Sequence, residues 1–410
     1  MNYRVWYSTE PFADYVINNT FLKNKSPTKR KMYESDANNS KNFHTMPDHI
    51  KKILYLDAPD LIVEINHEPI FSVEVSTEAG TGHNVFQRFA RLAASVENNV
   101  PSFYIYPEAV IIKRKGARPV WDRINPLIFK ALDDVMTIYK IPSLFYYFPS
   151  DYRSFKDAST SPNSKSKGIK FDKNRSFAGS PLGSDSEMIS MFSAMDEIIK
   201  TIEEQGVIKG REGLLGKRPI IDRKAYMMRE FISKGGSMSS SPLSAIEQIP
   251  TSYVLNYLKK FESEQYRVGE LLRSRQETIV YKVDAKFRGD PYPGALAAID
   301  YLKCREGRSF EERRHNLIMV WGRLSVDHTN ETLIINSDKS TVKDFISSVQ
   351  ASENKNILSK EYEELINNEI PRYYMQVRYG STYSKVKHIR VFSYFADAII
   401  FADGALWRDA

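Results

Sequence analysis

The chain has 410 residues, of which 42% are hydrophobic and 12% aromatic, so it can bury more than one core and disorder of the whole chain is excluded. Its single cysteine, Cys304, excludes an internal disulfide framework and a thiolate zinc cage. The net charge of +7 is compatible with a polyanionic partner such as nucleic acid. No stretch approaches the roughly 20 apolar residues that a membrane helix needs, so we expect no membrane partner.

Strand and helix patterns alternate through residues 1–150. Residues 53–65 and 69–76 predict two strands, and the turn-sized gap between them predicts a hairpin. Residues 84–97 carry an apolar stripe at helical spacing, and residues 102–106 predict a further strand. The expected order is therefore strand, strand, helix, strand.

Composition changes sharply at residues 151–186, which are rich in serine and lysine and poor in apolar side chains. Such a segment predicts a long loop or linker. A shorter stretch of the same character covers residues 234–242, and the apolar spacing over residues 188–202 between them predicts a helix.

Mixed patterns return after about residue 250. We predict strands over 278–284, 317–321, 373–379 and 389–401, and helices over 293–304 and 359–369. The expected fold class is α/β (α+β), with a mixed central sheet flanked by helices in residues 1–150 and a second mixed α/β domain in residues 187–410.

Carboxylates in the expected hairpin are the most informative side chains. Because strand side chains alternate between faces, Asp60 and Glu64 share a face of the first strand, and Ser72, Glu74 and Ser76 share a face of the second. Glu74 lies between two valines, where a carboxylate is unfavourable to bury unless it is paired or binds a cation. A hairpin can bring Asp60 beside Glu74, and two hard oxygen ligands suit Mg²⁺ or Mn²⁺.

Pro59-Asp60, then Glu74-Val75-Ser76, then a helix and a strand resemble the core of the PD-(D/E)XK nuclease superfamily, which includes many type II restriction endonucleases. The family motif is proline–aspartate, a spacer, and acid–any residue–lysine at a strand end. The resemblance covers about residues 50–108. It implies metal-dependent hydrolysis of phosphodiester bonds in double-stranded DNA, with Mg²⁺ (or Mn²⁺) held by Asp60 and Glu74. It also implies a homodimer and a cytoplasmic, bacterial or phage-encoded restriction system.

One position departs from the motif, because Ser76 stands where the family has lysine. The resemblance implies that Gln87 and Arg88, on the following helix, support catalysis in its place. Glu64, on the Asp60 face of the first strand, and Glu78, just past the second strand, are possible extra metal ligands. His83, in the loop that follows, is a candidate base or phosphate contact.

A second candidate catalytic site is Asp284-Ala-Lys286, which also has the acid–any residue–lysine form at an expected strand end. Upstream acids, Glu270 or Glu277, are its candidate partners, but no proline–aspartate precedes it at hairpin spacing. The alternative is a structural Asp–Lys strand end that leads into a proline-rich turn.

Basic residues of the C-terminal half are candidates for DNA binding, since arginine and lysine contact phosphates. These candidates are Arg305, Arg313, Arg314, Lys385, Lys387 and Arg390. Three alternatives to a nuclease at Asp60 and Glu74 stay open: a non-catalytic nucleic-acid-binding protein with a decayed nuclease core, a nuclease that uses Asp284 and Lys286, and a protein-interaction module with an acidic hairpin.

Overall fold

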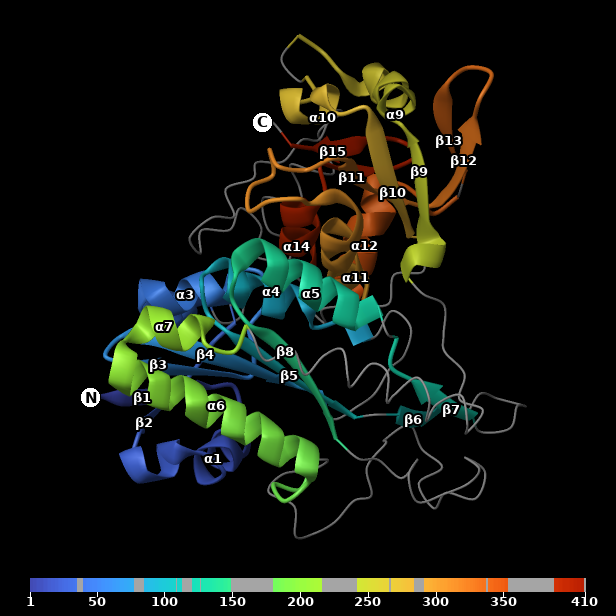
Figure 1. Ribbon diagram of the computed structural model, residues 1–410. Coiled ribbons are helices and arrows are strands. Elements are labelled where there is room, and N and C mark those ends of the chain that lie inside the picture. The colour runs from blue at the N-terminus through green and yellow to red at the C-terminus, as the bar shows by residue number, and fades with distance from the viewer. Residues whose placement is uncertain are drawn as a thin grey trace. The chain divides into compact units, whose positions relative to one another are not determined.

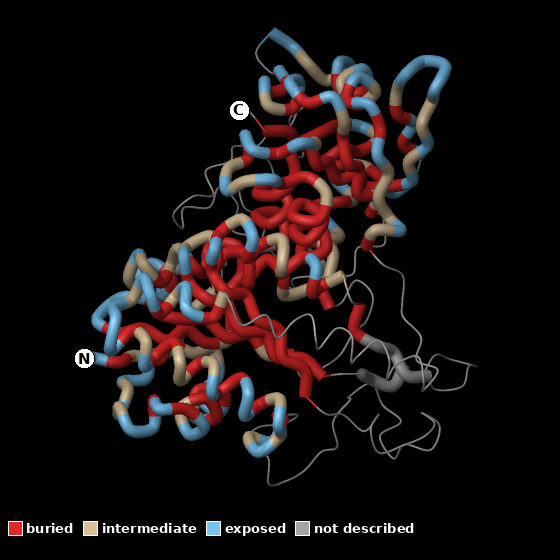
Figure 2. Tube along the Cα trace, viewed as in Figure 1, coloured by how far each residue is buried: buried red, intermediate tan, exposed pale blue. Residues whose placement is uncertain are grey.

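The computed structural model forms two compact units, Met1–Glu34 with Lys41–Ser241 and Pro242–Ala410 with Ser35–Ser40. Each unit contains its own mixed sheet with helices packed on it (Figure 1), which confirms the expected α/β class. Buried residues follow the strands and the inner sides of the helices (Figure 2). The structure describes residues 1–34, 40–76, 85–107, 109–112, 120–125, 127–148, 180–215, 242–264, 267–283, 291–336, 338–352 and 387–408.

Six strands form the sheet of the first unit, in the order β2-β1-β3-β4-β5-β8. Strands β1, β3 and β4 are antiparallel neighbours, whereas β4, β5 and β8 run parallel. The short strand β2 pairs in parallel with β1 at one edge. The strands are β1 (Tyr3–Tyr7), β2 (Thr28–Lys31), β3 (Leu61–Ile65), β4 (Glu68–Val75), β5 (Ser102–Pro107) and β8 (Ser143–Phe148), and β6 (Ala109–Ile112) and β7 (Val120–Arg123) form a separate antiparallel pair.

Helices cover both faces of this sheet. Helices α3, α4 and α5 pack together on one face, and α1 and α6 lie on the other (Figure 1). Helix α7 follows α6 and contacts β4. The helices are α1 (Glu10–Asn18), α2 (Ser40–Thr45), α3 (Asp48–Leu54), α4 (Phe89–Glu97), α5 (Leu127–Tyr139), α6 (Ser186–Gln205) and α7 (Val207–Glu212), with a 3₁₀ turn over Phe21–Lys25.

The helix expected over residues 188–202 is confirmed as α6, and its apolar stripe packs on the first sheet. Met188, Phe192, Met195 and Ile199 are buried, and Phe192 meets Tyr15 of α1 edge to face, with ring centroids 5.5 Å apart. The first unit therefore extends through α6 and α7, which differs from the second domain expected from residue 187. Residues 151–179 of the expected linker and residues 234–241 of the shorter stretch lie outside the described residues.

The expected hairpin forms from β3 and β4. Its first strand begins later than the sequence suggested, at Leu61, because Ile53 and Leu54 complete α3. A two-residue turn joins the strands, and its residues Asn66 and His67 have φ values of 49° and 69°. Positive φ at both positions matches the right-handed twist of the flanking strands.

The second unit has a five-stranded sheet in the order β15-β14-β11-β10-β9. Strands β10, β11 and β14 run parallel, and antiparallel strands flank them on both sides. Its strands are β9 (Ile246–Pro250), β10 (Glu277–Val283), β11 (Asn316–Trp321), β14 (Ala398–Ile400) and β15 (Ala405–Trp407), and a separate hairpin consists of β12 (Arg323–Asp327) and β13 (Thr332–Asn336).

The helices of the second unit also lie on two faces of its sheet. Helices α9 and α10 pack with β13 over a core that contains Val280, Ile318 and Trp407. Phe345 of α12 packs against Trp321 and Phe392. The helices are α9 (Thr251–Leu258), α10 (Glu270–Ser274), α11 (Pro291–Ile299), α12 (Val342–Ser352) and α14 (Lys387–Phe395), with 3₁₀ turns over Pro242–Ala245 and Lys259–Phe261 and a π-helical turn over Asp300–Cys304.

Two C-terminal predictions differ from the structure. The strand expected over 389–401 is wrong for most of its length, because α14 occupies residues up to Phe395 and only Ala398–Ile400 is extended. The segment is rich in β-branched and aromatic residues, which favour strands, and residues 388–395 are all buried, including the polar side chains of His388, Arg390 and Ser393. The elements expected over 359–369 and 373–379 lie outside the described residues. No helix among the described residues is both long enough and apolar enough to cross a bilayer.

Candidate functional site

Asp60 and Glu74 lie opposite each other where β3 begins and β4 ends. Leu61 of β3 pairs with Val73 of β4, so the antiparallel register places Asp60 across from Glu74. The Asp60 carboxylate is fixed there because its Oδ2 accepts a hydrogen bond from the Val75 backbone N–H at 2.9 Å. The convergence expected from the hairpin is therefore present.

Glu74 is buried, with 1% of its surface exposed, and two arginines engage its carboxylate. Arg91 of α4 places Nη1 at 2.9 Å from Oε1 and 3.0 Å from Oε2. Arg88, which precedes α4, places Nε at 3.1 Å from Oε1. Helix α4 covers this face of β4, which is why its polar side chains meet a strand residue.

A third carboxylate, Asp57, joins the group. Arg91 Nε donates to Asp57 Oδ2 at 2.7 Å, so this one guanidinium bridges Asp57 and Glu74. Burial opposes the charge of Arg91, but Asp57, Glu74 and Asp60 together outweigh it and raise its pKa. We call Asp57, Asp60 and Glu74 the acidic cluster.

Opposing influences act on the pKa of the Glu74 carboxyl. Burial raises the pKa of this carboxyl to about 8, and nearby Asp60 adds to that rise, while Arg91 and Arg88 act in the opposite direction. A carboxyl in this state gains most from an additional cation, because a cation restores the charged form that burial disfavours.

Tyr104 lies on the neighbouring strand β5, directly opposite Glu74 in the parallel register of β4 and β5. The side chain is fully buried, and its hydroxyl has no hydrogen-bond partner among the described residues. Burial raises the pKa of this hydroxyl, and the charges of Arg88, Glu74 and Arg91 act on it as well. It is therefore a neutral polar group at the edge of the acidic cluster.

Other predicted site residues lie close by or fall outside the described part of the chain. Ser76 is buried, and its backbone N–H donates to the Ile105 carbonyl at 2.9 Å. Gln87 is half-buried and, like Arg88, lies in the turn before α4 and not on the helix as expected. Glu78 and His83 lie outside the described residues.

Arg91 and Asp57 are members of this group that were not predicted as site residues from the sequence. Arg91 lies among apolar neighbours in a helix whose residues from Phe89 to Val96 are all buried. A buried glutamate on one strand requires a buried cation close by, and an arginine inside the apolar stripe of the next helix was the available signal.

The second candidate site and part of the expected DNA-binding set lie outside the described residues. These residues are Asp284, Lys286 and Lys385, together with the side chain of Lys387. Arg314 is exposed, and its Nε donates to the Lys303 carbonyl at 3.0 Å.

Three of the expected DNA-binding arginines are buried in the second unit, namely Arg305, Arg313 and Arg390. Arg305 and Arg313 bind Asp300 at 2.7 and 2.8 Å, and Arg313 also binds Asp397 at 3.1 Å. Asp300 and Asp397 neutralise the charges of Arg305 and Arg313 inside the unit. Arg390 is buried as well, so we assign no phosphate contact to these three arginines.

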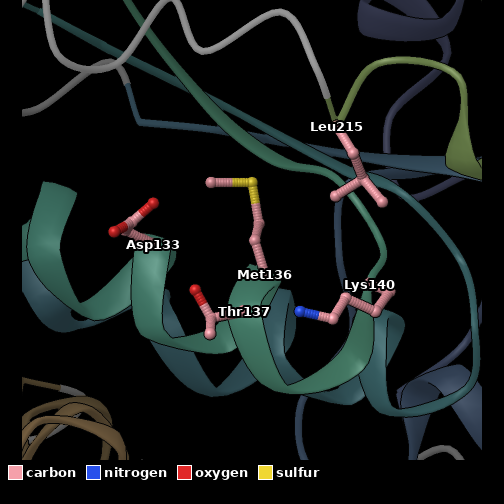
Figure 3. Close-up of a pocket in the computed structure, with 5 residues that line it drawn as sticks. All are labelled: Asp133, Met136, Thr137, Lys140 and Leu215. Atoms are coloured by element: carbon pink, nitrogen blue, oxygen red, sulfur yellow. The ribbon is translucent and has the colours of Figure 1, made fainter.

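A pocket of about 230 Å³ lies beside α5. Figure 3 shows Asp133, Met136, Thr137 and Lys140 on that helix, with Leu215 on the opposite side of the pocket. It contains no member of the acidic cluster, and it is smaller than the roughly 300 Å³ at which pockets for small organic ligands begin. The lining residues are Asp133, Met136, Thr137, Lys140 and Leu215.

In comparisons with known proteins, no protein-family model, no curated protein and no solved structure matches this chain.

Proposed function

We propose that the chain is a Mg²⁺-dependent DNA endonuclease of the type II restriction class, with its active site at the acidic cluster. The observation that carries the proposal is a fully buried glutamate, Glu74, opposite Asp60 at the end of a hairpin. A divalent cation would explain why a second carboxylate, Asp60, stands opposite a glutamate whose charged form burial already disfavours.

The donor set fits Mg²⁺ or Mn²⁺. Asp60 and Glu74 would hold the ion through carboxylate oxygens, which are the hard ligands these ions prefer. Their present hydrogen bonds do not preclude this, because each carboxylate oxygen has two lone-pair sites. When bound, the ion supplies charge stabilisation at a phosphodiester and a more acidic water.

The protein's own residues then have separate roles. Asp57 and Arg91 hold the Glu74 side chain in place through the 2.7 and 2.9 Å contacts. Arg88 has 22% of its side chain exposed, so it can reach a DNA phosphate, and we assign it the cationic role that Ser76 cannot fill. Double-stranded DNA as substrate and a homodimeric, cytoplasmic enzyme are part of the proposal.

The test is cleavage of supercoiled plasmid with and without Mg²⁺, using Asp60→Asn and Glu74→Gln. These changes preserve side-chain size, so the fold should persist. We expect discrete bands from the unchanged protein, and a loss of at least about a hundredfold in each variant, as typical of removing a catalytic electrostatic group. Asp133→Asn on α5 is the matched control and should cleave normally.

One specific observation favours the alternative of DNA binding without cleavage: Arg88 and Arg91 already balance the charge of Glu74, and Ser76 replaces the motif lysine. In that case the protein binds DNA at low salt but leaves plasmid intact with Mg²⁺ or Mn²⁺. Loss of cleavage in Lys286→Ala, with Asp60→Asn active, would move the active site to Asp284 and Lys286. Absence of DNA affinity at low salt would instead favour a protein-interaction module.

A further inference from the structure

A second group of ligand-type side chains lies at the other end of the β3–β4 hairpin. His49 of α3, Glu64 of β3 and His67 of the turn each offer a ligand atom, and these atoms all lie within 4.8 Å of one another. The Nε2 of His49 is 2.8 Å from Glu64 Oε2. The two imidazole rings have centroids 6.0 Å apart.

Backbone irregularities on both sides aim these side chains at one point. The register of β3 and β4 shifts between Val63 and Glu64, and such a bulge redirects the residues that follow it. His67 has a left-handed backbone, with φ of 69°, which only a minority of non-glycine residues adopt. The positive φ of His67 belongs to the hairpin turn, and the turn together with the bulge places His67 within reach of the buried Glu64.

We propose that His49, Glu64 and His67 form a binding site for one Zn²⁺ ion. Two imidazole nitrogens and one carboxylate oxygen are a recurrent zinc ligand set, with water as the fourth ligand. Neighbouring ligand atoms on tetrahedral zinc lie about 3.3 Å apart, so the His49–Glu64 pair needs to open by only about half an ångström to admit the ion.

Arg4 supports this assignment. Its Nη1 is 2.8 Å from Glu64 Oε1, while Oε2 faces His49. One carboxylate oxygen is thus oriented by a fixed cation and the other faces the histidines, which is how outer residues commonly orient a metal ligand.

The zinc site is separate from the acidic cluster and goes beyond the proposed function. Asp60 and Glu64 are four residues apart along extended chain, which is roughly 13 Å. The ion would tie α3 to the tip of the hairpin, since its ligands come from a helix, a strand and a turn. Binding of the ion at this site does not depend on nuclease activity.

The experiment is a titration of metal-free, full-length Asp60→Asn protein with Zn²⁺ by calorimetry, and with Co²⁺ by visible absorption. The Asp60→Asn background removes the candidate Mg²⁺ ligand, so failure here is distinct from failure of the nuclease proposal. We expect one Zn²⁺ per chain, a Co²⁺ spectrum of tetrahedral type, and a rise in the unfolding temperature on adding Zn²⁺.

His67→Asn is the decisive variant, because asparagine tolerates the left-handed backbone and His67 is exposed. We expect its zinc affinity to fall at least about tenfold. The loss of a direct ligand should cost no less than the loss of a group that only orients one. His44→Asn, at an exposed histidine of α2, should bind zinc normally. Absence of saturable binding, or equal affinity in His67→Asn and His44→Asn, would overturn the site in favour of a plain His–Glu hydrogen bond.

Discussion

Arg91 binds Glu74 from the helix that follows the glutamate's own strand, with Nη1 2.9 Å from Oε1 and 3.0 Å from Oε2. The same guanidinium reaches Asp57 through Nε at 2.7 Å. One buried arginine thereby connects the loop before β3, the strand β4 and the helix α4. The geometry of the acidic cluster depends on it.

Replacing Arg91 should therefore destabilise the protein strongly. Arg91→Ala leaves Asp57 and Glu74 buried without their main cation, and we expect the free energy of unfolding to drop by about 3–5 kcal/mol. Arg88→Ala, which removes a half-buried partner of the same glutamate, should lower it by no more than about 1 kcal/mol. Urea unfolding of both variants measures this, and equal losses would contradict the central role of Arg91.

The pKa of Glu74, raised by burial to about 8 from an ordinary value of 4.5, makes stability depend on pH. Between these two values the folded protein binds more protons than the unfolded chain, so the free energy of unfolding falls as pH rises. The decrease is at most about 1.4 kcal/mol for each pH unit. Glu74→Gln should lack this component, and the difference between the two pH profiles isolates it.

The proposed binding of Mg²⁺ at the acidic cluster should have the opposite pH dependence. Because the ion needs the ionised form of Glu74, its affinity and the rate of cleavage should rise as pH increases toward about 8. Calorimetry in two buffers of different ionisation enthalpy detects the released proton. A profile that is flat across this range would argue against Glu74 as a ligand.

In the second unit, Asp397 is a buried carboxylate that pairs with more than one arginine. Its Oδ2 lies 3.1 Å from Arg313 Nη1 and accepts the Leu317 N–H at 2.9 Å, and its Oδ1 lies 3.5 Å from Arg408. Asp397→Asn leaves buried arginines without their counter-ion, so we expect a loss of about 3–5 kcal/mol. Asp338→Asn, at an exposed position, is the control and should change stability by less than about 0.5 kcal/mol.

Two glycines with positive φ separate backbone strain from steric overlap. Gly206 has φ of 89°, and a Cβ there would meet nothing within 4 Å, so Gly206→Ala should cost about 1–3 kcal/mol through strain alone. Gly322 has φ of 131°, and its Cβ would lie 2.1 Å from Ser340 Oγ. We expect Gly322→Ala to be the more destabilising of the two in thermal unfolding, and the reverse order would rule out this overlap.

The sequence predicted those features that depend on local periodicity. The β3–β4 hairpin, α6 and β10 were predicted from the spacing of apolar residues along each segment. Asp60 and Glu74 could be predicted to lie opposite each other because a hairpin fixes its own register. The helix α14 was missed because Ile389, Val391, Phe392 and Tyr394 are residue types that favour strands. The ion pairs of Arg91 and Arg313 join residues distant in sequence or on different elements, which periodicity does not reveal.

Both sheets bring the carboxyl ends of three parallel strands to one edge, β4, β5 and β8 in the first unit and β10, β11 and β14 in the second. Ligands of open α/β sheets characteristically gather at such edges. Ser76 directly follows β4, and Asp284 directly follows β10. A single exchange, Ser76→Lys, would complete the order of acid, any residue and lysine at the carboxyl end of β4, so one substitution would supply the cation that the proposed site lacks at this position.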